Sequence, residues 1–90
     1  FHDAEFKVIG YEEGKPYIRG DEVFQVPVWI CETEDGGNFN VTASGNMYEK
    51  AMQWGEKEDL IGEMLTVKYH NMSKDNIPQL PVALDWRFDL

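Results

Sequence analysis

Apolar and polar residues alternate along most of this chain in short runs, a pattern typical of β-strands that have one buried and one solvated face. The alternation predicts five strands, with turns rich in Gly, Pro, Asn and Asp between them. We expect these strands at residues 6–11, 23–31, 38–43, 64–70 and 80–88.

The side chains of each strand divide into two faces. In the first strand Phe6, Val8 and Gly10 share one face, and Lys7, Ile9 and Tyr11 share the other. In the fourth strand Leu65, Val67 and Tyr69 are expected inward, and Thr66, Lys68 and His70 outward. In the fifth, Val82, Leu84, Trp86 and Phe88 oppose Ala83, Asp85 and Arg87.

The turns have their own signals. Residues 12–16 are expected to reverse the chain, with Gly14 free to adopt positive φ and Pro16 fixing its own. Residues 34–37 predict a hairpin turn. Pro27 cannot donate to a ladder, so we expect a bulge or an edge at that point of the second strand.

One segment, residues 46–55, has a helical pattern. Asn46 is a favourable N-cap, and Glu49 follows at the spacing of a capping box. Met47, Ala51 and Trp54 form one apolar stripe, and Gly55 is expected to end the helix.

Three strands, a helix and two further strands predict an all-β fold, namely a five-stranded OB-fold Greek-key barrel with one short helix between strands three and four. An SH3-like barrel is the structural alternative, but it lacks a helix at this position. A length of 90 residues corresponds to one domain, so residues 1–90 are expected to form a single OB-fold domain.

Composition and charge limit the functional classes. The single cysteine, Cys31, cannot form an internal disulfide, which favours a reducing, cytoplasmic location over secretion. No apolar run is long enough for a membrane span, so no membrane association is expected. The net charge is −9, with nine acids and three bases in residues 1–35 and eight acids and five bases in residues 36–90. Any nucleic-acid surface is therefore expected in the second half, and binding by this domain alone is expected to be weak.

Three parts of the sequence together resemble a known family. The last third has a Leu60-Ile61-Gly62 segment, a strand with Val67 and Tyr69, a polar turn, and a Pro-x-x-Pro-Val segment, residues 78–82, that leads to Arg87. The opening residues 3–14 and residues 37–45 also fit the same domain. The order and spacing of these pieces resemble the C-terminal OB domain of ATP-dependent DNA ligases of the small bacterial and phage kind.

The resemblance implies a domain that closes over the adenylation site and then contacts nicked double-stranded DNA during replication, repair or recombination. It implies that Arg87 and Gln79 assist at the nucleotide pyrophosphate, and that DNA is contacted by Lys68, Ser44, Gly45, Asn46 and Arg87. A planar guanidinium can pair two phosphate oxygens at once, and a polar loop at a helix N-terminus favours an anion.

The resemblance also implies the chemistry of a parent enzyme. ATP and Mg²⁺ would serve that enzyme, with none bound by this domain alone, and a nucleotidyltransferase domain would be attached in cis. The Lys-x-Asp-Gly signature of the adenylated lysine is absent from these 90 residues, so we expect no catalytic residue here and treat the chain as the C-terminal part of a longer, monomeric ligase in a bacterial cell or phage-infected host. His2, His70 and Cys31 lack metal-ligand spacing, so no metal site is expected.

Three positions depart from the family pattern: Gln79 stands where an arginine is usual, Asp85 where a base is common, and Leu90 where a lysine is typical. Two alternatives remain open. One is the OB domain of an mRNA-capping-type guanylyltransferase, and the other is a non-catalytic OB module that binds nucleic acid or protein.

Overall fold

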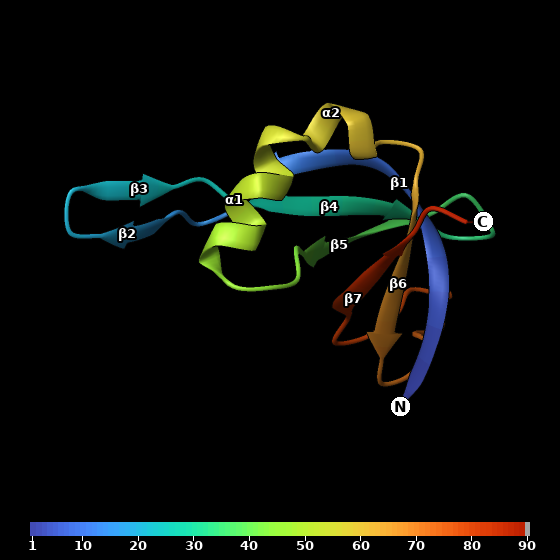
Figure 1. Cartoon of the computed structure of the whole chain (residues 1–90). Helices are drawn as coiled ribbons and strands as arrows, with labels where there is room; N and C mark the ends of the chain where they lie inside the picture. Colours follow the sequence, from blue (N-terminus) through green and yellow to red (C-terminus); the bar gives the residue numbers. More distant parts are fainter. Residues whose placement is uncertain (90) are drawn as a thin grey trace.

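The computed structural model describes residues 1–89. Its centre is a five-stranded antiparallel sheet with the order β5-β4-β1-β6-β7 (Figure 1). These strands are β1 (His2–Glu13), β4 (Pro27–Glu32), β5 (Asn38–Thr42), β6 (Met64–Tyr69) and β7 (Val82–Arg87). The predicted strands at 38–43, 64–70 and 80–88 are confirmed within two residues at each end.

The long first strand organises the sheet, because its first half pairs with β6 and its second half with β4. A register shift between Val8 and Gly10 bends β1 between the two partners. β5 and β7 approach one another, but among residues 1–89 no ladder joins these two edges. The sheet is therefore a coiled, partly open barrel, as OB folds are.

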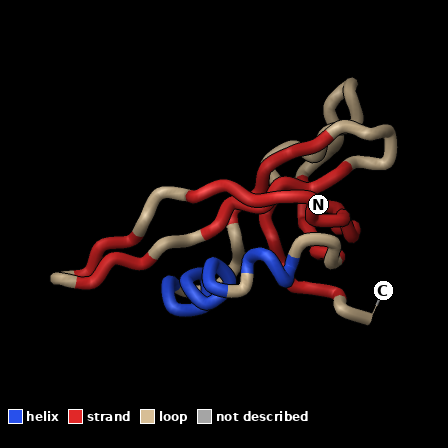
Figure 2. The backbone as a smooth tube through the Cα atoms, turned by 90° about the horizontal axis from the view of Figure 1, so that it is seen from above, coloured by secondary structure: helices blue, strands red, loops and turns tan. Residues whose placement is uncertain are grey.

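The second predicted strand is wrong at its start. Residues 17–24 instead form a separate hairpin of β2 (Tyr17–Arg19) and β3 (Glu22–Phe24), and β4 begins only at Pro27. The chain reverses at Gly20, whose φ is +61°. Gly14 does not have the positive φ that the sequence predicted, and the chain does not reverse there. Figures 1 and 2 show this hairpin projecting away from the rest of the molecule.

Two helices follow β5 and lie along one side of the sheet (Figure 2). They are α1 (Met47–Gly55) and α2 (Lys57–Leu60). The Asn46 cap is confirmed, since its Oδ1 accepts a hydrogen bond from the Glu49 amide at 2.9 Å. Gly55 is the last helical residue and Glu56 the C-cap, because the chain turns directly into α2, which the sequence did not predict. No helix of residues 1–89 is long and apolar enough to cross a membrane.

The core lies on the inner face of the coiled sheet, where α2 adds the buried Leu60 and α1 has no buried residue. Val8, Trp29, Cys31, Leu65 and Val67 have no exposed surface. Around them pack Phe6, Phe39, Val41, Ala43, Leu60 and Ala83, all buried.

The inward and outward faces are confirmed for β6, where Leu65 and Val67 are buried and Lys68 is exposed. In β7 the predicted division fails before Trp86. A register shift between Thr66 and Val67 lets Ala83 turn inward and leaves Val82 and Leu84 exposed. The same effect in β1 turns Tyr11 toward the core, away from the face of Lys7.

Candidate nucleic-acid interface

The sheet has a solvated side over β1, β6 and β7, which we call the outer face. The register defines it, because directly opposed residues of antiparallel strands point to the same side. Three rows of opposed residues cross β1, β6 and β7 in that order on this side. They are Lys7–Met64–Arg87, Glu5–Thr66–Asp85 and Asp3–Lys68–Val82. Lys7, Lys68 and Arg87 are thus accompanied by Asp3, Glu5 and Asp85, and Asp89 adds a fourth acid beside Arg87, so this face is close to neutral in a chain of net charge −9.

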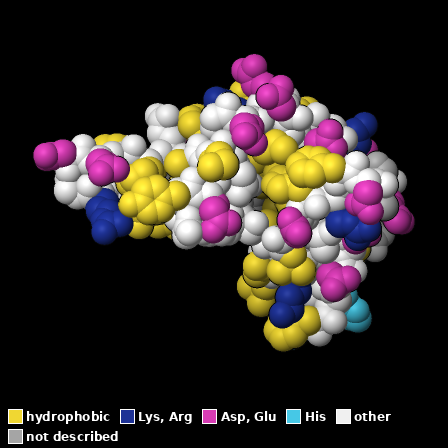
Figure 3. Space-filling view, viewed as in Figure 1, with side chains coloured by type: hydrophobic (Ala, Val, Ile, Leu, Met, Phe, Trp, Pro, Cys, Tyr) yellow, Lys and Arg dark blue, Asp and Glu magenta, His cyan; other side chains and the backbone are white. Residues whose placement is uncertain are grey.

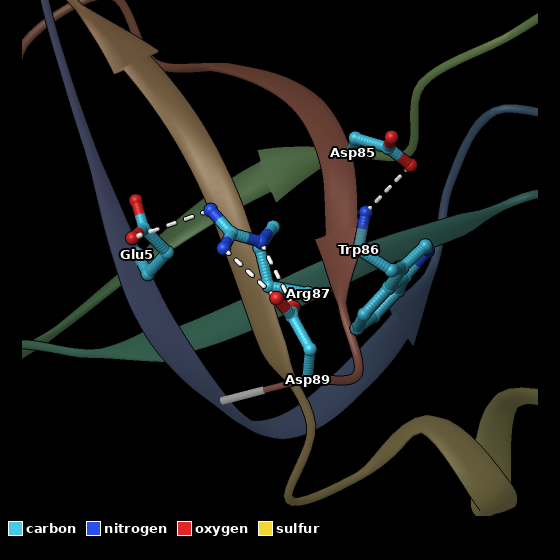
Figure 4. A network of polar contacts seen from close by, with 5 residues as sticks. All are labelled: Glu5, Asp85, Trp86, Arg87 and Asp89. Atoms are coloured by element: carbon cyan, nitrogen blue, oxygen red, sulfur yellow. Dashed lines mark hydrogen bonds and ion pairs between the residues drawn. The ribbon is translucent and has the colours of Figure 1, made fainter.

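Arg87 lies at one end of the outer face, on the last residue of β7. Its guanidinium makes two parallel contacts with Asp89, Nε to Oδ1 at 3.1 Å and Nη2 to Oδ2 at 3.2 Å. Nη1 lies 3.8 Å from Glu5 Oε1, so the fork is held between two carboxylates (Figure 4). Hydrogen bonding by Asp89 raises the pKa of Arg87, and hydrogen bonding by Arg87 lowers the pKa of the Asp89 carboxyl.

The Arg87–Asp89 pair shows what the guanidinium is able to bind. A carboxylate held by two parallel N–H groups is the geometry in which arginine also holds a phosphate. Since both side chains are solvent-exposed, a phosphate can replace Asp89 without desolvating a buried charge. The neighbouring Leu90 lies outside the described residues.

Lys68 lies at the opposite end of the outer face. Its side chain is exposed, and its Nζ lies 4.5 Å from the centre of the Phe1 ring. Gln79 is also at this end and is exposed. Its backbone is fixed, because its amide donates to the Asn71 carbonyl at 2.8 Å and its carbonyl accepts from the His70 amide at 3.0 Å. The structure therefore places Gln79 near Lys68 and at the other end of β7 from Arg87, although the sequence analysis assigned Gln79 and Arg87 to one task.

The Ser44-Gly45-Asn46 loop lies on the other side of β7. It borders a hollow of about 320 Å³ whose opposite wall is formed by Pro81, Val82 and Ala83. Val82 is also the partner of Lys68 on the outer face. The start of β7 thus separates Lys68 from the loop, so these two predicted contacts flank one strand.

Gln53 was not predicted from the sequence, yet its side chain hydrogen-bonds the Ser44 loop, β4 and β7. From α1, its Nε2 donates to the Ser44 carbonyl at 2.9 Å. Its Oε1 accepts from the indoles of Trp29 and Trp86, each at 3.3 Å. A glutamine on a helix carries no signal for such a role in a single sequence, because its partners lie 9, 24 and 33 residues away.

The surface charge is mixed. Figure 3 shows Lys and Arg interspersed with Asp and Glu on the visible side, with apolar side chains between them. Within residues 1–89, no group of three His, Cys, Asp or Glu side chains is arranged to hold a metal ion. Arg87, Lys68 and the backbone of the Ser44–Asn46 loop supply hydrogen-bond donors that an extended anion can accept from.

Comparison with solved structures reveals the same fold elsewhere. The crystal structure of Chlorella virus DNA ligase-adenylate superposes with a TM-score of 0.71 at 24% sequence identity, covering 96% of this chain and 30% of that chain. This likeness confirms the predicted OB fold, and it means that the chain spans about 30% of the length of that ligase.

Comparison at the level of sequence identifies the family. No curated protein matches the sequence. Residues 26–87, more than two thirds of the chain, match the family described as DNA ligase OB-like domain. The chain therefore belongs to the DNA ligase OB-like domain family.

Proposed function

We propose that this chain is the OB domain of an ATP-dependent DNA ligase and that it contacts the backbone of nicked duplex DNA through the outer face. The observation that carries this proposal is the placement of Lys68 and Arg87 on one solvated face of β6 and β7 in a member of this family. Arg87 contributes a two-pronged phosphate contact, Lys68 a point charge, and the Ser44–Asn46 loop backbone N–H groups.

The domain positions the substrate and performs no covalent chemistry of its own. Phosphate contacts fix register and orientation but carry no sequence code, which suits an enzyme that must act at any nick. Adenylation by ATP and Mg²⁺ belongs to a nucleotidyltransferase domain in cis, over which this domain closes. In that closed state Arg87 is the residue that assists at the pyrophosphate. Gln79 brings no charge and lies at the far end of β7, so its contribution there is smaller.

The remaining parts of the proposal concern the parent protein. It acts as a monomer in the cytoplasm of a bacterial cell or a phage-infected host, without membrane contact. The balance of charges on the outer face limits the domain's own affinity, so tight binding requires the attached domain. Two or three phosphate contacts give a log–log salt slope of roughly −2 to −3.

The test is a titration of fluorescein-labelled, singly nicked duplex with the wild-type domain and two variants, read by fluorescence anisotropy at several salt concentrations. Arg87→Ala should weaken binding about tenfold and make the salt slope shallower by about 0.9. Lys15→Ala is the matched control, because Lys15 is an exposed cation between β1 and β2, outside the outer face.

The same pair of variants in the parent enzyme tests the role in catalysis. Arg87→Ala should reduce steady-state sealing of a nicked duplex, whereas Lys15→Ala should seal like wild type. If Lys15→Ala fails while Arg87→Ala seals normally, the outer face is not the DNA-facing surface. An absence of any duplex binding by the wild-type domain would favour the protein-binding module instead.

A further inference from the structure

We propose that Gln53 is a positioning residue, which holds the Ser44–Asn46 loop at a fixed distance from β7 so that both contact one DNA backbone. This inference rests on the proposed function and assigns a role to a residue that has no contact with DNA of its own. It is based on the three hydrogen bonds of the Gln53 carboxamide.

The three bonds reach three separate segments. Trp29 is a fully buried residue of β4, Trp86 is a half-buried residue of β7, and Ser44 belongs to the loop before α1. The two indole rings meet edge to face with centroids 5.1 Å apart, so their N–H groups converge on one oxygen. The carboxamide therefore connects the buried core and the end of β7 that carries Arg87 to the Ser44 carbonyl, which belongs to the loop beside the hollow.

Only an amide satisfies this arrangement. The indole N–H groups donate and need an acceptor, whereas the Ser44 carbonyl accepts and needs a donor. A glutamate at this position would retain the acceptor for both tryptophans but place a carboxylate against the Ser44 carbonyl. A methionine would keep the length of the side chain and lose all three bonds without adding charge.

The base of the loop is already near β7, because β5 approaches that strand and Ala43 and Ala83 are both buried in the core. The Asn46 side chain binds the Glu49 amide of its own helix, which orders the helix start but not its distance from the strand. The Gln53–Ser44 bond is the contact that joins the loop carbonyl to a group also bonded to β7. A contact held in place before binding loses less entropy on binding, which is how a bridge of this kind raises affinity.

The experiment compares Gln53→Met with Gln25→Met in the anisotropy titration with nicked duplex. Gln25 is an exposed residue whose side-chain amide donates a hydrogen bond to the Glu13 carboxylate at 3.4 Å. Gln53→Met should weaken binding about tenfold and leave the salt slope unchanged, because the loop offers neutral backbone N–H groups whose loss releases no counterions. Gln25→Met should bind within about twofold of wild type with an unchanged slope, since it loses one exposed bond.

The affinity of the folded molecules distinguishes positioning from a loss of stability. A partly unfolded sample has fewer active molecules, but it shows the wild-type Kd once the protein concentration is corrected for the folded fraction, whereas a loss of positioning leaves the corrected Kd about tenfold weaker. The ¹⁵N-indole signals of the folded variants add a structural reading. Those of Trp29 and Trp86 should shift in Gln53→Met, and that of Trp54, which does not bond Gln53, should stay in place.

Gln53→Glu is the second variant if the methionine variant does not fold. It should keep the Trp29 and Trp86 indole signals near their wild-type positions and still bind about tenfold more weakly, while Gln25→Glu, which adds the same charge, should bind within about twofold of wild type. Wild-type affinity in a folded Gln53 variant, together with weak binding by Arg87→Ala, would refute the positioning role and leave the proposed function intact. If the wild-type domain and Arg87→Ala bind equally, the proposed function fails and the positioning role fails with it.

Discussion

Replacing Gly45 by alanine should be among the most destabilising single-methyl additions in this chain. Gly45 has φ +101°, a conformation that costs a residue with a Cβ atom about 1–2 kcal/mol. A Cβ built there would also lie 2.9 Å from Glu49 Cβ and 2.9 Å from Glu49 Oε2. The carboxylate can move away, but Glu49 Cβ is fixed to the first turn of α1, so the loop or the helix must shift.

The two effects add to a substantial loss. Overpacking of this kind costs about 1–3 kcal/mol, so we expect Gly45→Ala to lower the free energy of unfolding by about 2–5 kcal/mol in total. For a domain of this size each kcal/mol lowers the melting temperature by about 4–8 °C, which gives a decrease of roughly 8–40 °C. The measurements are urea unfolding followed by tryptophan fluorescence and thermal unfolding followed by circular dichroism.

Gly36 provides the matched control. It has φ +86°, and nothing lies within 4 Å of a Cβ built on it. Gly36→Ala therefore carries the conformational cost alone, about 1–2 kcal/mol. The difference between the two variants isolates the contact with Glu49. Equal losses of stability would show that the start of α1 yields freely, and the reasoning about the fixed loop would be refuted.

Two further predictions concern single side chains. Burial raises the pKa of Cys31 from 9.0 to about 12, so at pH 8 its thiolate fraction is lowered about 1000-fold. The thiol reagent DTNB should therefore leave the native protein unmodified and react fully in guanidinium chloride. Rapid reaction of the native protein would contradict the buried site. Asp89→Asn should tighten binding to nicked duplex a few-fold, because it frees the Arg87 guanidinium. Asp85→Asn removes the same charge from the outer face and should have a smaller effect. Equal effects in the anisotropy titration would show that charge alone matters and not the bidentate pair.

The fold was largely predictable because strand pairing follows the alternation of side chains. What alternation cannot reveal is where it changes phase. The shift near Ile9 in β1 and the one opposite Leu84 in β7 each move later residues to the other face. The β2–β3 hairpin was missed for a related reason. Its apolar residues Ile18 and Val23 are exposed, so their pattern does not report a buried face.

The candidate site was only partly predictable. The outward direction of Lys68 follows from strand periodicity and is confirmed. The bidentate contact of Arg87 with Asp89 and the bridge made by Gln53 depend on the exact path of the chain after β7 and on the approach of α1 to the sheet. Both are tertiary contacts that periodicity does not encode.

The strong negative charge of the chain is compatible with DNA contact because salt screens the interactions between exposed charges and makes them short-ranged. At physiological ionic strength exposed charges farther than about 8 Å apart are largely screened from each other. A phosphate near Arg87 therefore responds mainly to the outer face, where three cations nearly balance four acids, and much less to the acids elsewhere in the chain, such as those on the projecting hairpin. The distant charge slows the approach to DNA by repulsion, while the nearly balanced face permits a local contact once a phosphate replaces Asp89 on Arg87. Under the proposed function, this arrangement predicts that the isolated domain binds DNA weakly and releases it readily, as expected of a part that closes over a nucleotide and then turns to a nick.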